Sequence, residues 1–287
     1  EVITQVPLST RKQVGQAVSA AQSAFTVWRH TPVSKRVSYL YKLIQLLREN
    51  EDQISRTLVL EMGKSLPDAY AEMKRVFENI ETACGMPMLQ QGDKAIGCAS
   101  GIDGEVLRLP LGVFGIISPF NFPAMVPFWF LPYAIATGNT CVVKVSEQVP
   151  GTMSLIAKYI DQTGLPAGVF NLVHGDKTAA AALLDHPLVK GVSFVGSSQI
   201  AKLVAEKCAQ TNKRCQAMGG AKNHLVVMPD TKINEVVRNM IVSCFGCAGQ
   251  RCMAASAIVT VGQETHQLIC EQLISAAKKL TVANPLD

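Results

Sequence analysis

Cys252 is the side chain best suited to covalent chemistry. It ends the stretch Gly246-Cys247-Ala248-Gly249-Gln250-Arg251-Cys252, which lies between a helical pattern over residues 233–247 and an apolar run over residues 257–261. Small residues let a substrate approach, and the adjacent Arg251 guanidinium favours the thiolate, the reactive form of cysteine. A lone cysteine more often packs in a core, so the case for a nucleophile depends on its neighbours.

Asn121 is the candidate partner of this thiol. It lies in Ser118-Pro119-Phe120-Asn121-Phe122-Pro123, directly after an apolar run over residues 113–117. A neutral amide held between prolines and aromatic residues can stabilise negative charge that develops on a carbonyl oxygen. Asn is also an ordinary turn residue, so this role depends on where the fold places the loop.

Polar residues that suit a dinucleotide follow other apolar runs. Lys144 ends the run over residues 140–144, and Ser146 and Glu147 follow it. An ammonium there can reach ribose hydroxyls or phosphate, and a carboxylate can accept ribose hydroxyl hydrogen bonds; a strand end that leaves into solvent is the alternative. Residues 196–197 open a helical pattern where N–H groups can meet a pyrophosphate. The absence of a Gly-x-Gly-x-x-Gly fingerprint disfavours an ordinary Rossmann dehydrogenase.

The elements that must position these residues alternate along the chain. β-branched apolar runs alternate with helical patterns, which predicts a parallel sheet with helices on both faces and ligands at the carboxyl ends of its strands. The predicted strands are residues 113–117, 140–144, 169–173, 192–195 and 224–228, and the predicted helices are 124–137, 149–162, 177–185, 199–209 and 233–247. Amphipathic patterns over 10–28, 35–48 and 68–86 predict an N-terminal helical region, capped at Ser9 or Thr10 and at Ser34.

Composition excludes several classes of protein. Hydrophobic residues make up 48% of the 287 residues and charged residues 17%, which indicates a globular chain. The net charge of +5 is spread along the sequence, so no nucleic-acid partner is expected. The stretch from Leu109 to Val143 has no charged side chain, but its prolines would break a membrane helix, and no membrane partner is expected.

Cysteine and histidine usage predicts free thiols and no metal. The nine cysteines have no regular spacing, which indicates a reducing compartment. Cys244 and Cys247 form a Cys-x-x-Cys without a second pair, so packing is expected in place of a zinc or redox site. A start at Glu1 without methionine indicates a processed or excised chain.

Seven motifs, in order, resemble the aldehyde dehydrogenase superfamily along essentially the whole chain. They are Glu61-Met62-Gly63-Lys64, Pro119-Phe120-Asn121-Phe122-Pro123, Lys144 with Ser146-Glu147, Gly164-Leu165-Pro166-Ala167-Gly168-Val169, Phe194-Val195-Gly196-Ser197, Met218-Gly219-Gly220-Ala221-Lys222 and Gly249-Gln250-Arg251-Cys252.

The resemblance implies an α/β fold with a Rossmann-like NAD-binding domain. N-terminal helices and this domain would span residues 1–229, and the first part of a catalytic domain would span 230–287. Because family subunits are longer, the chain is expected to stop before the end of that domain. The cofactor-binding residues that the resemblance implies are Ser118, Phe120, Lys144, Ser146, Glu147, Gly175, Gly196, Ser197 and Gly219.

More narrowly, the chain resembles the methylmalonate-semialdehyde dehydrogenase branch, which acylates coenzyme A. Arg75 matches the helical arginine that grips the substrate carboxylate there, and Arg251 is expected to assist it, since a guanidinium matches a carboxylate in shape. Hydrolytic members carry a glutamate base where this chain has Met218, and a thioether cannot be a general base. The acyl-enzyme is therefore expected to wait for the thiol of coenzyme A.

The resemblance also implies a mechanism. The Cys252 thiolate attacks a small semialdehyde, the Asn121 amide and the Cys252 N–H hold the oxyanion, and NAD takes the hydride. Loss of carbon dioxide and attack by coenzyme A would give propionyl-CoA from methylmalonate semialdehyde, or acetyl-CoA from malonate semialdehyde. A homo-oligomer, dimer or tetramer, is expected, in the cytoplasm or in a eukaryotic mitochondrial matrix.

Two alternatives stay open at this point. One is a hydrolytic aldehyde dehydrogenase with a displaced base, for which Glu147 and Glu61 are the nearest motif carboxylates. The other is a truncated, non-catalytic protein that binds NAD or joins full-length subunits.

Overall fold

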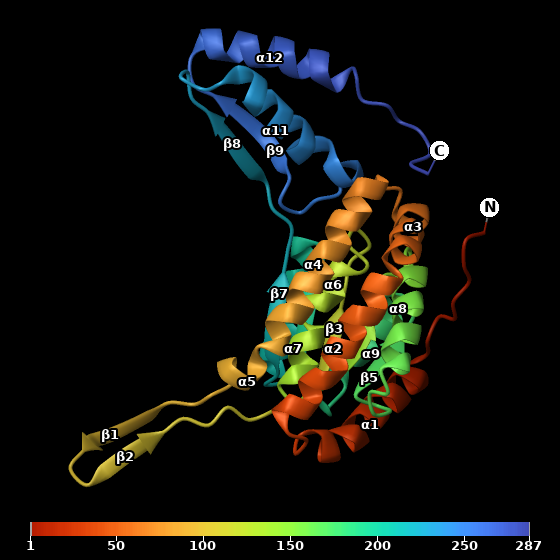
Figure 1. The fold of residues 1–287 in the computed structure, drawn as a ribbon, viewed down its shortest axis with the longest axis vertical. Helices are drawn as coiled ribbons and strands as arrows, with labels where there is room; N and C mark the ends of the chain where they lie inside the picture. Colours follow the sequence, from red (N-terminus) through yellow and green to blue (C-terminus); the bar gives the residue numbers. More distant parts are fainter. Residues whose placement is uncertain (1, 287) are drawn as a thin grey trace.

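A five-stranded parallel sheet lies at the centre of the computed structural model, which describes residues 2–286 (Figure 1). Its strand order is β5-β4-β3-β6-β7, and each neighbouring pair is parallel. The chain moves outward in one direction from β3 to β5 and then resumes on the other side of β3, so the strand order reverses between β3 and β6. Open sheets bind ligands beyond the carboxyl ends of their strands at such a point. The strands are β3 (Val113–Ile117), β4 (Thr140–Lys144), β5 (Phe170–Val173), β6 (Val189–Val195) and β7 (Arg214–Met218).

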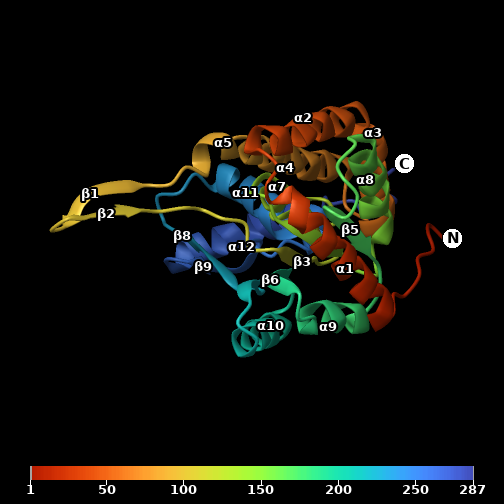
Figure 2. The same cartoon turned by 90° about the horizontal axis from the view of Figure 1, so that it is seen from below.

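Helices cover both faces of this sheet and enclose two apolar cores, which confirms the predicted fold class. One core joins α1, α9 and α10 to Val113, Ile117 and Val192 of the sheet, and the other joins α2, α3, α4, α7 and α8 to Ile116 and Val143. Figure 2 shows α9 and α10 on one side of the sheet and α2 to α4 on the other. The helices are α1 (Arg11–Trp28), α2 (Val33–Glu49), α3 (Glu51–Met62), α4 (Leu66–Cys84), α7 (Leu131–Ala136), α8 (Pro150–Gln162), α9 (Lys177–Asp185) and α10 (Ser198–Gln210).

The N-terminal helices follow their amphipathic patterns closely. Thr10 caps α1 as predicted, in a capping box with Gln13. The predicted cap at Ser34 is wrong, because α2 begins at Val33, directly after Pro32, and Ser34 lies inside its first turn. The sequence pattern also missed α3, whose buried stripe is short.

The stretch from Leu109 to Val143, which has no charged side chain, folds as the strand β3, a loop, a broken helix and most of β4. The single helix predicted over residues 124–137 is instead two short helices, α6 (Met125–Phe128) and α7. Pro127 and Pro132 have no N–H to donate, so one continuous helix would lose hydrogen bonds there. Among the described residues, no helix combines the length and apolar character needed to cross a bilayer.

A two-stranded antiparallel hairpin projects from the body of the molecule (Figure 1). It follows the short helix α5 (Met86–Leu89) and consists of β1 (Lys94–Ala99) and β2 (Ile102–Glu105). Nearly all of its side chains are exposed. The sequence predicts no strand here, because these residues form no apolar run or alternation.

A second, two-stranded parallel sheet stands apart from the first. It pairs β8 (Asn223–Val227) with β9 (Ala255–Thr260) and packs against α11 (Ile233–Phe245) and α12 (Gln263–Ala277) around its own small core. The strand predicted over residues 224–228 therefore belongs to this sheet, and β7 is the fifth strand of the main sheet. β7 was missed because it is an edge strand whose side chains are mostly exposed. The domain boundary at residue 229 stays a prediction.

Candidate active site

Cys252 follows a turn with an unusual backbone conformation. The turn joins α11 to β9 and contains a short 3-10 helix, η1 (Gly246–Gly249). Cys247 and Ala248 have φ values of 55° and 52°, in the left-handed region. That region costs an L-residue about 1–2 kcal/mol, and backbone strain of this kind is concentrated at functional sites. The surroundings of the turn must therefore impose its shape.

Asp68, in the first turn of α4, accepts two hydrogen bonds from this part of the chain. Its Oδ2 accepts the backbone N–H of Cys247 at 3.0 Å, and its Oδ1 accepts a guanidinium N–H of Arg251 at 2.6 Å. Burial acts to raise the pKa of Asp68, but these hydrogen bonds and one from Ser65 outweigh it and leave the pKa below its ordinary value. The carboxylate stays ionised and holds the turn over residues 246–251 to α4. This turn is called the nucleophile turn below, after the role predicted for Cys252.

The two cysteines of the turn have different environments. Cys247 is buried, and its Sγ lies 4.0 Å from the sulfur of Met62 and 3.7 Å from the backbone oxygen of Asn121. Burial raises the pKa of the Cys247 thiol above its ordinary value. Cys252 is partly exposed and lines a cavity. Cys247 packs, as predicted, and Cys252 is the thiol that a substrate can reach.

Asn121 lies against the nucleophile turn, although 129 positions separate it from the residue it contacts. Its side-chain Nδ2 donates to the backbone oxygen of Gln250 at 2.5 Å. The loop that carries Asn121 leaves the carboxyl end of β3, beside the point where the strand order reverses. Because an amide NH₂ has two donors, one bond to Gln250 leaves a second N–H for an oxyanion. The geometry brings the two predicted catalytic residues together.

Lys64 and Glu72 form hydrogen bonds with the loop that carries Asn121, and the sequence alone predicts a role for neither. The Lys64 ammonium donates to Glu72 Oε2 at 2.5 Å and to the backbone oxygen of Asn121 at 2.8 Å. Glu72 was detectable in principle: it lies on the buried stripe of α4, between apolar residues at 69, 73, 76 and 77. A carboxylate at such a position requires a partner.

A cavity of about 480 Å³ brings the predicted nucleophile, Cys252, and both predicted carboxylate-binding arginines together. Cys252, Arg75 and Arg251 all line it, with Phe122 and Trp129 among the apolar residues of its wall. Asp68 and Glu72 also line the cavity, but each is paired with a cation, Asp68 with Arg251 and Glu72 with Lys64. A thiol, two guanidinium groups and an apolar wall suit a short aldehyde that carries a carboxylate. The groups that line the cavity therefore fit the semialdehyde substrate that the sequence predicts.

Each of these arginines already has a carboxylate partner. Arg75 pairs with Glu78 on the exposed surface of α4 at 2.6 Å, and Arg251 pairs with Asp68. Arg251 Nε is buried and has no hydrogen-bond partner among the described residues. Buried polar groups are normally paired, and this donor belongs to a residue that lines the Cys252 cavity.

The predicted cofactor residues of β4 lie at the carboxyl edge of the main sheet. Lys144 is 5% exposed, and its ammonium lies 3.0 Å from Glu147. Burial acts to raise the pKa of Glu147, but its own backbone N–H and Lys144 outweigh this and hold the pKa below its ordinary value. The Ser146 hydroxyl accepts the backbone N–H of Gln148 at 3.3 Å and shapes the turn.

Two buried polar atoms at this same edge have no partner among the described residues. They are Ser118 Oγ, after β3, and His174 Nδ1, after β5. Since buried polar atoms are normally hydrogen-bonded, a polar ligand along this edge fits the residues present. The side chain of Phe120, also predicted to contact the cofactor, is 37% exposed on the same loop as Ser118.

The N-terminus of α10 fits a phosphate group. Ser197 is its N-cap residue but makes no capping hydrogen bond, so its hydroxyl and the first N–H groups of the helix are available. A Cβ on Gly196 would lie 2.4 Å from the ring of Phe194, and Gly219 packs against Ser198. Gly175 has a φ of 140°, which favours glycine. A side chain at any of these three positions would crowd neighbouring atoms of the chain.

Neither alternative carboxylate is placed to act as a base. Glu61 caps the N-terminus of α8: it accepts the N–H groups of Gly151 and Thr152 and the Thr152 hydroxyl. Glu147 pairs with Lys144. Met218, where hydrolytic members have glutamate, ends β7 and is 41% exposed. The hydrolytic alternative is not favoured.

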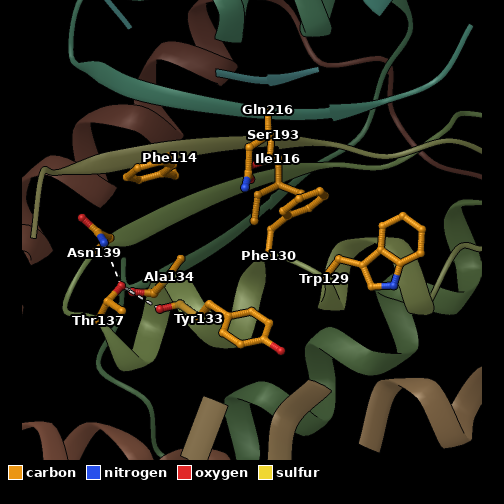
Figure 3. Close-up of a pocket in the computed structure, with 10 residues that line it drawn as sticks. All are labelled: Phe114, Ile116, Trp129, Phe130, Tyr133, Ala134, Thr137, Asn139, Ser193 and Gln216. Carbon is orange, nitrogen blue, oxygen red and sulfur yellow. Dashed lines mark hydrogen bonds between the residues drawn. The ribbon is translucent and has the colours of Figure 1, made fainter. Parts of the chain in front are cut away.

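A second cavity, of about 360 Å³, lies between α7 and the main sheet (Figure 3). Aromatic side chains of Phe114, Phe130 and Tyr133 point toward it, with Asn139 and Gln216 at its polar margin. Its wall has no thiol and no charged group. This cavity therefore does not offer the chemistry of the Cys252 site.

The chain is similar to several known proteins over nearly its whole length. Malonate-semialdehyde dehydrogenase 2 of Geobacillus kaustophilus (strain HTA426) is 46% identical over 287 residues, which are 100% of this chain and 59% of the relative. The crystal structure of methylmalonate-semialdehyde dehydrogenase from Oceanimonas doudoroffii matches with a TM-score of 0.97 and 43% identity, over 100% of this chain and 59% of that one. A Sinorhizobium meliloti 1021 protein complexed with NAD has a TM-score of 0.93 and 38% identity, over 96% of this chain and 56% of that one.

The chain thus spans 59% of the length of the first two relatives. A sequence model of the aldehyde dehydrogenase family matches residues 1–287. The chain belongs to the aldehyde dehydrogenase family.

Proposed function

We propose that the protein oxidises malonate or methylmalonate semialdehyde with NAD through a thioester on Cys252 and transfers the acyl group to coenzyme A. The observation that carries this proposal is the cavity that Cys252 shares with Arg75 and Arg251. The names of the Geobacillus and Oceanimonas relatives support the substrate class, and the NAD complex of the Sinorhizobium protein supports the cofactor.

Cys252 and Asn121 carry the first step. The thiolate attacks the aldehyde carbon, a carbon–sulfur bond forms, and the carbonyl electron pair moves onto oxygen. The free N–H of the Asn121 amide and the backbone N–H of Cys252 stabilise that oxyanion. When NAD is bound, it accepts the hydride as the carbon–oxygen double bond re-forms and leaves a thioester.

Residues at the carboxyl edge of the main sheet would hold the cofactor. Ser197 and the N-terminus of α10 suit the pyrophosphate, and Lys144 with Glu147 suits ribose hydroxyls. The unpartnered Ser118 Oγ and His174 Nδ1 suit further polar atoms of the same ligand. These residues orient the cofactor beside Cys252 without taking part in bond making.

The final step follows from a missing base. Met218 cannot activate water, so the thioester persists. The carbon–carbon bond to the carboxylate breaks, carbon dioxide leaves, and the thioester enolate that remains takes a proton from water. The thiol of coenzyme A then loses its proton to water and attacks the thioester carbonyl. The acyl–sulfur bond to Cys252 then breaks, and the Cys252 thiolate is regenerated.

The test is a burst experiment on the natural chain that contains these 287 residues. With NAD and malonate semialdehyde but no coenzyme A, we expect one NADH per Cys252 and then near arrest. Addition of coenzyme A should start steady turnover and release acetyl-CoA. Steady turnover in water alone would favour a hydrolytic enzyme, whereas NAD binding without any burst would favour a non-catalytic NAD-binding protein.

We also propose a homo-oligomer, and the β1–β2 hairpin supports it. A bare two-stranded hairpin is only marginally stable in water, and this one carries exposed Ile96 and Ile102. Light scattering on the natural chain, with and without residues 94–105, tests the proposal. Loss of the dimer or tetramer on deletion is the expected result; an unchanged mass would exclude the hairpin as the contact.

A further inference from the structure

We propose that the buried Lys64–Glu72 ion pair is a positioning device that holds the Asn121 amide against the nucleophile turn. The inference rests on the proposed function, in which that amide stabilises the oxyanion. Glu72 also lines the Cys252 cavity, but its side chain is 0% exposed and both of its carboxylate oxygens accept hydrogen bonds. Lys64 and Glu72 act through the loop after β3.

The first observation is the burial of the pair. Both side chains are 0% exposed, whereas in each other ion pair within residues 2–286 at least one partner is more than 20% exposed. Well-packed apolar side chains often replace a buried ion pair without loss of stability. Packing alone therefore gives no reason for two charges here.

The second observation is where the polar atoms of the pair point. The Lys64 ammonium donates to the Asn121 backbone oxygen and lies 4.4 Å from the centre of the Phe122 ring. Glu72 Oε1 accepts the backbone N–H groups of Ala124 and Met125, at 2.9 and 3.0 Å. Two side chains thus hold four residues of one short loop, and the loop is the one that carries Asn121.

The third observation links this loop to the nucleophile turn. The Asn121 backbone oxygen that Lys64 binds also lies 3.7 Å from the Cys247 thiol, and the Asn121 side chain binds the backbone of Gln250. Asn121 therefore contacts the nucleophile turn from both its backbone and its side chain. A shift of the loop would move the oxyanion donor away from Cys252.

The test compares two matched double variants of the natural chain. Lys64→Met/Glu72→Gln removes both charges, and the amide oxygen introduced at position 72 can still accept the two backbone N–H groups. Arg48→Met/Glu81→Gln removes the exposed pair between α2 and α4, where Arg48 also lies over an aromatic ring. We expect the rate constant of the NADH burst to fall about 10- to 100-fold in the first variant, as for other small displacements of catalytic groups, and to stay unchanged in the second.

A double-mutant cycle separates positioning from general damage. If Lys64 and Glu72 act through Asn121, the same double variant should cost little further burst rate in an Asn121→Ala background. An equal fold-loss in both backgrounds would overturn the proposal. NAD affinity and the melting temperature should change little, since α4 and the sheet keep their apolar packing.

Hydrogen exchange gives a readout that needs no activity. The amides of Ala124 and Met125 should exchange at least about ten times faster in Lys64→Met/Glu72→Gln, while those of α8 do not change. A neutral amide oxygen holds these N–H groups more weakly than a carboxylate does, and the loop also loses the bond from Lys64 to Asn121. Unchanged exchange of the Ala124 and Met125 amides would overturn the proposal even if the variant were inactive. An unmodified protein without a burst would instead refute the proposed function, and exchange would still show whether the pair holds the loop.

Discussion

Replacing Ala248 by glycine should stabilise the protein, because it relieves strain in the turn before Cys252. Ala248 has φ 52° and ψ 30°, and its side chain is exposed. Its methyl group therefore has little buried contact to lose. The same turn holds Cys247 in the left-handed region, but that side chain is buried and its replacement would also remove packing.

The expected change in the free energy of unfolding for Ala248→Gly follows from two opposing contributions. An L-residue in the left-handed region loses about 1–2 kcal/mol, and a glycine adds about 0.4–1 kcal/mol of unfolded-state entropy that must be lost on folding. The difference is a gain of about 0.5–1 kcal/mol in the free energy of unfolding. Ala205 provides the matched control, because it is exposed in the middle of α10 and its change to glycine should cost about 1 kcal/mol.

Urea unfolding followed by circular dichroism measures the effect. We expect the midpoint to rise for Ala248→Gly and to fall for Ala205→Gly. The NADH burst should be slower in Ala248→Gly, because the turn that presents Cys252 becomes freer while the fold becomes more stable. A fall in the midpoint for both variants would refute the reasoning, since it would mean that Ala248 is unstrained.

Three further predictions concern the chemistry of the site. Met218→Glu should convert the burst into steady NADH production in water without coenzyme A, since it restores a carboxylate where hydrolytic members have their base. Arg75→Met should raise KM for malonate semialdehyde about 10- to 100-fold, the loss expected for charge-assisted hydrogen bonds, and leave KM for propanal unchanged; an equal rise for both aldehydes would exclude a carboxylate contact. The pKa of folded Asp68 is below its ordinary 3.8, so its stabilising contribution is complete above that value and disappears as the pH falls through the folded pKa. The difference in urea midpoint between the natural protein and Asp68→Asn should thus be large at about pH 7 and shrink by about pH 3, and a constant difference would show that the carboxylate charge contributes nothing.

Local sequence patterns were sufficient for most of the fold. Buried strands such as β3 and β4 are runs of apolar, β-branched residues, because parallel strands are covered on both faces. The exposed edge strand β7 and the hairpin have no such signal, because neither is buried on two faces. Apolar periodicity predicts one helix over residues 124–137, whereas Pro127 and Pro132, which lack an N–H, divide the segment into two.

In the candidate site, the sequence predicted the types of reactive group but not their arrangement in space. The residue types of Cys252, Asn121, Arg75 and Arg251, read with their motifs, predicted a thiol, an oxyanion donor and a carboxylate grip, because each side chain carries its chemistry wherever the chain places it. Only the fold gathers Arg75, Arg251 and Cys252 around one cavity, because Arg75 lies far from the other two in sequence. Only the fold brings the Asn121 side chain to the backbone of Gln250.

Only the tertiary structure decided what holds these groups in place. The sequence does not give the partners of Asp68, Lys64 and Glu72, although the position of Glu72 on an apolar stripe indicates that it needs one. Their partners in the Asn121 loop, in the start of α6 and in the nucleophile turn lie 52 to 183 positions away. A hydrogen bond depends on the distance between two atoms, and for residues so far apart only the folded chain sets that distance. The identity of the reacting groups is thus a local property, and their alignment is a global one.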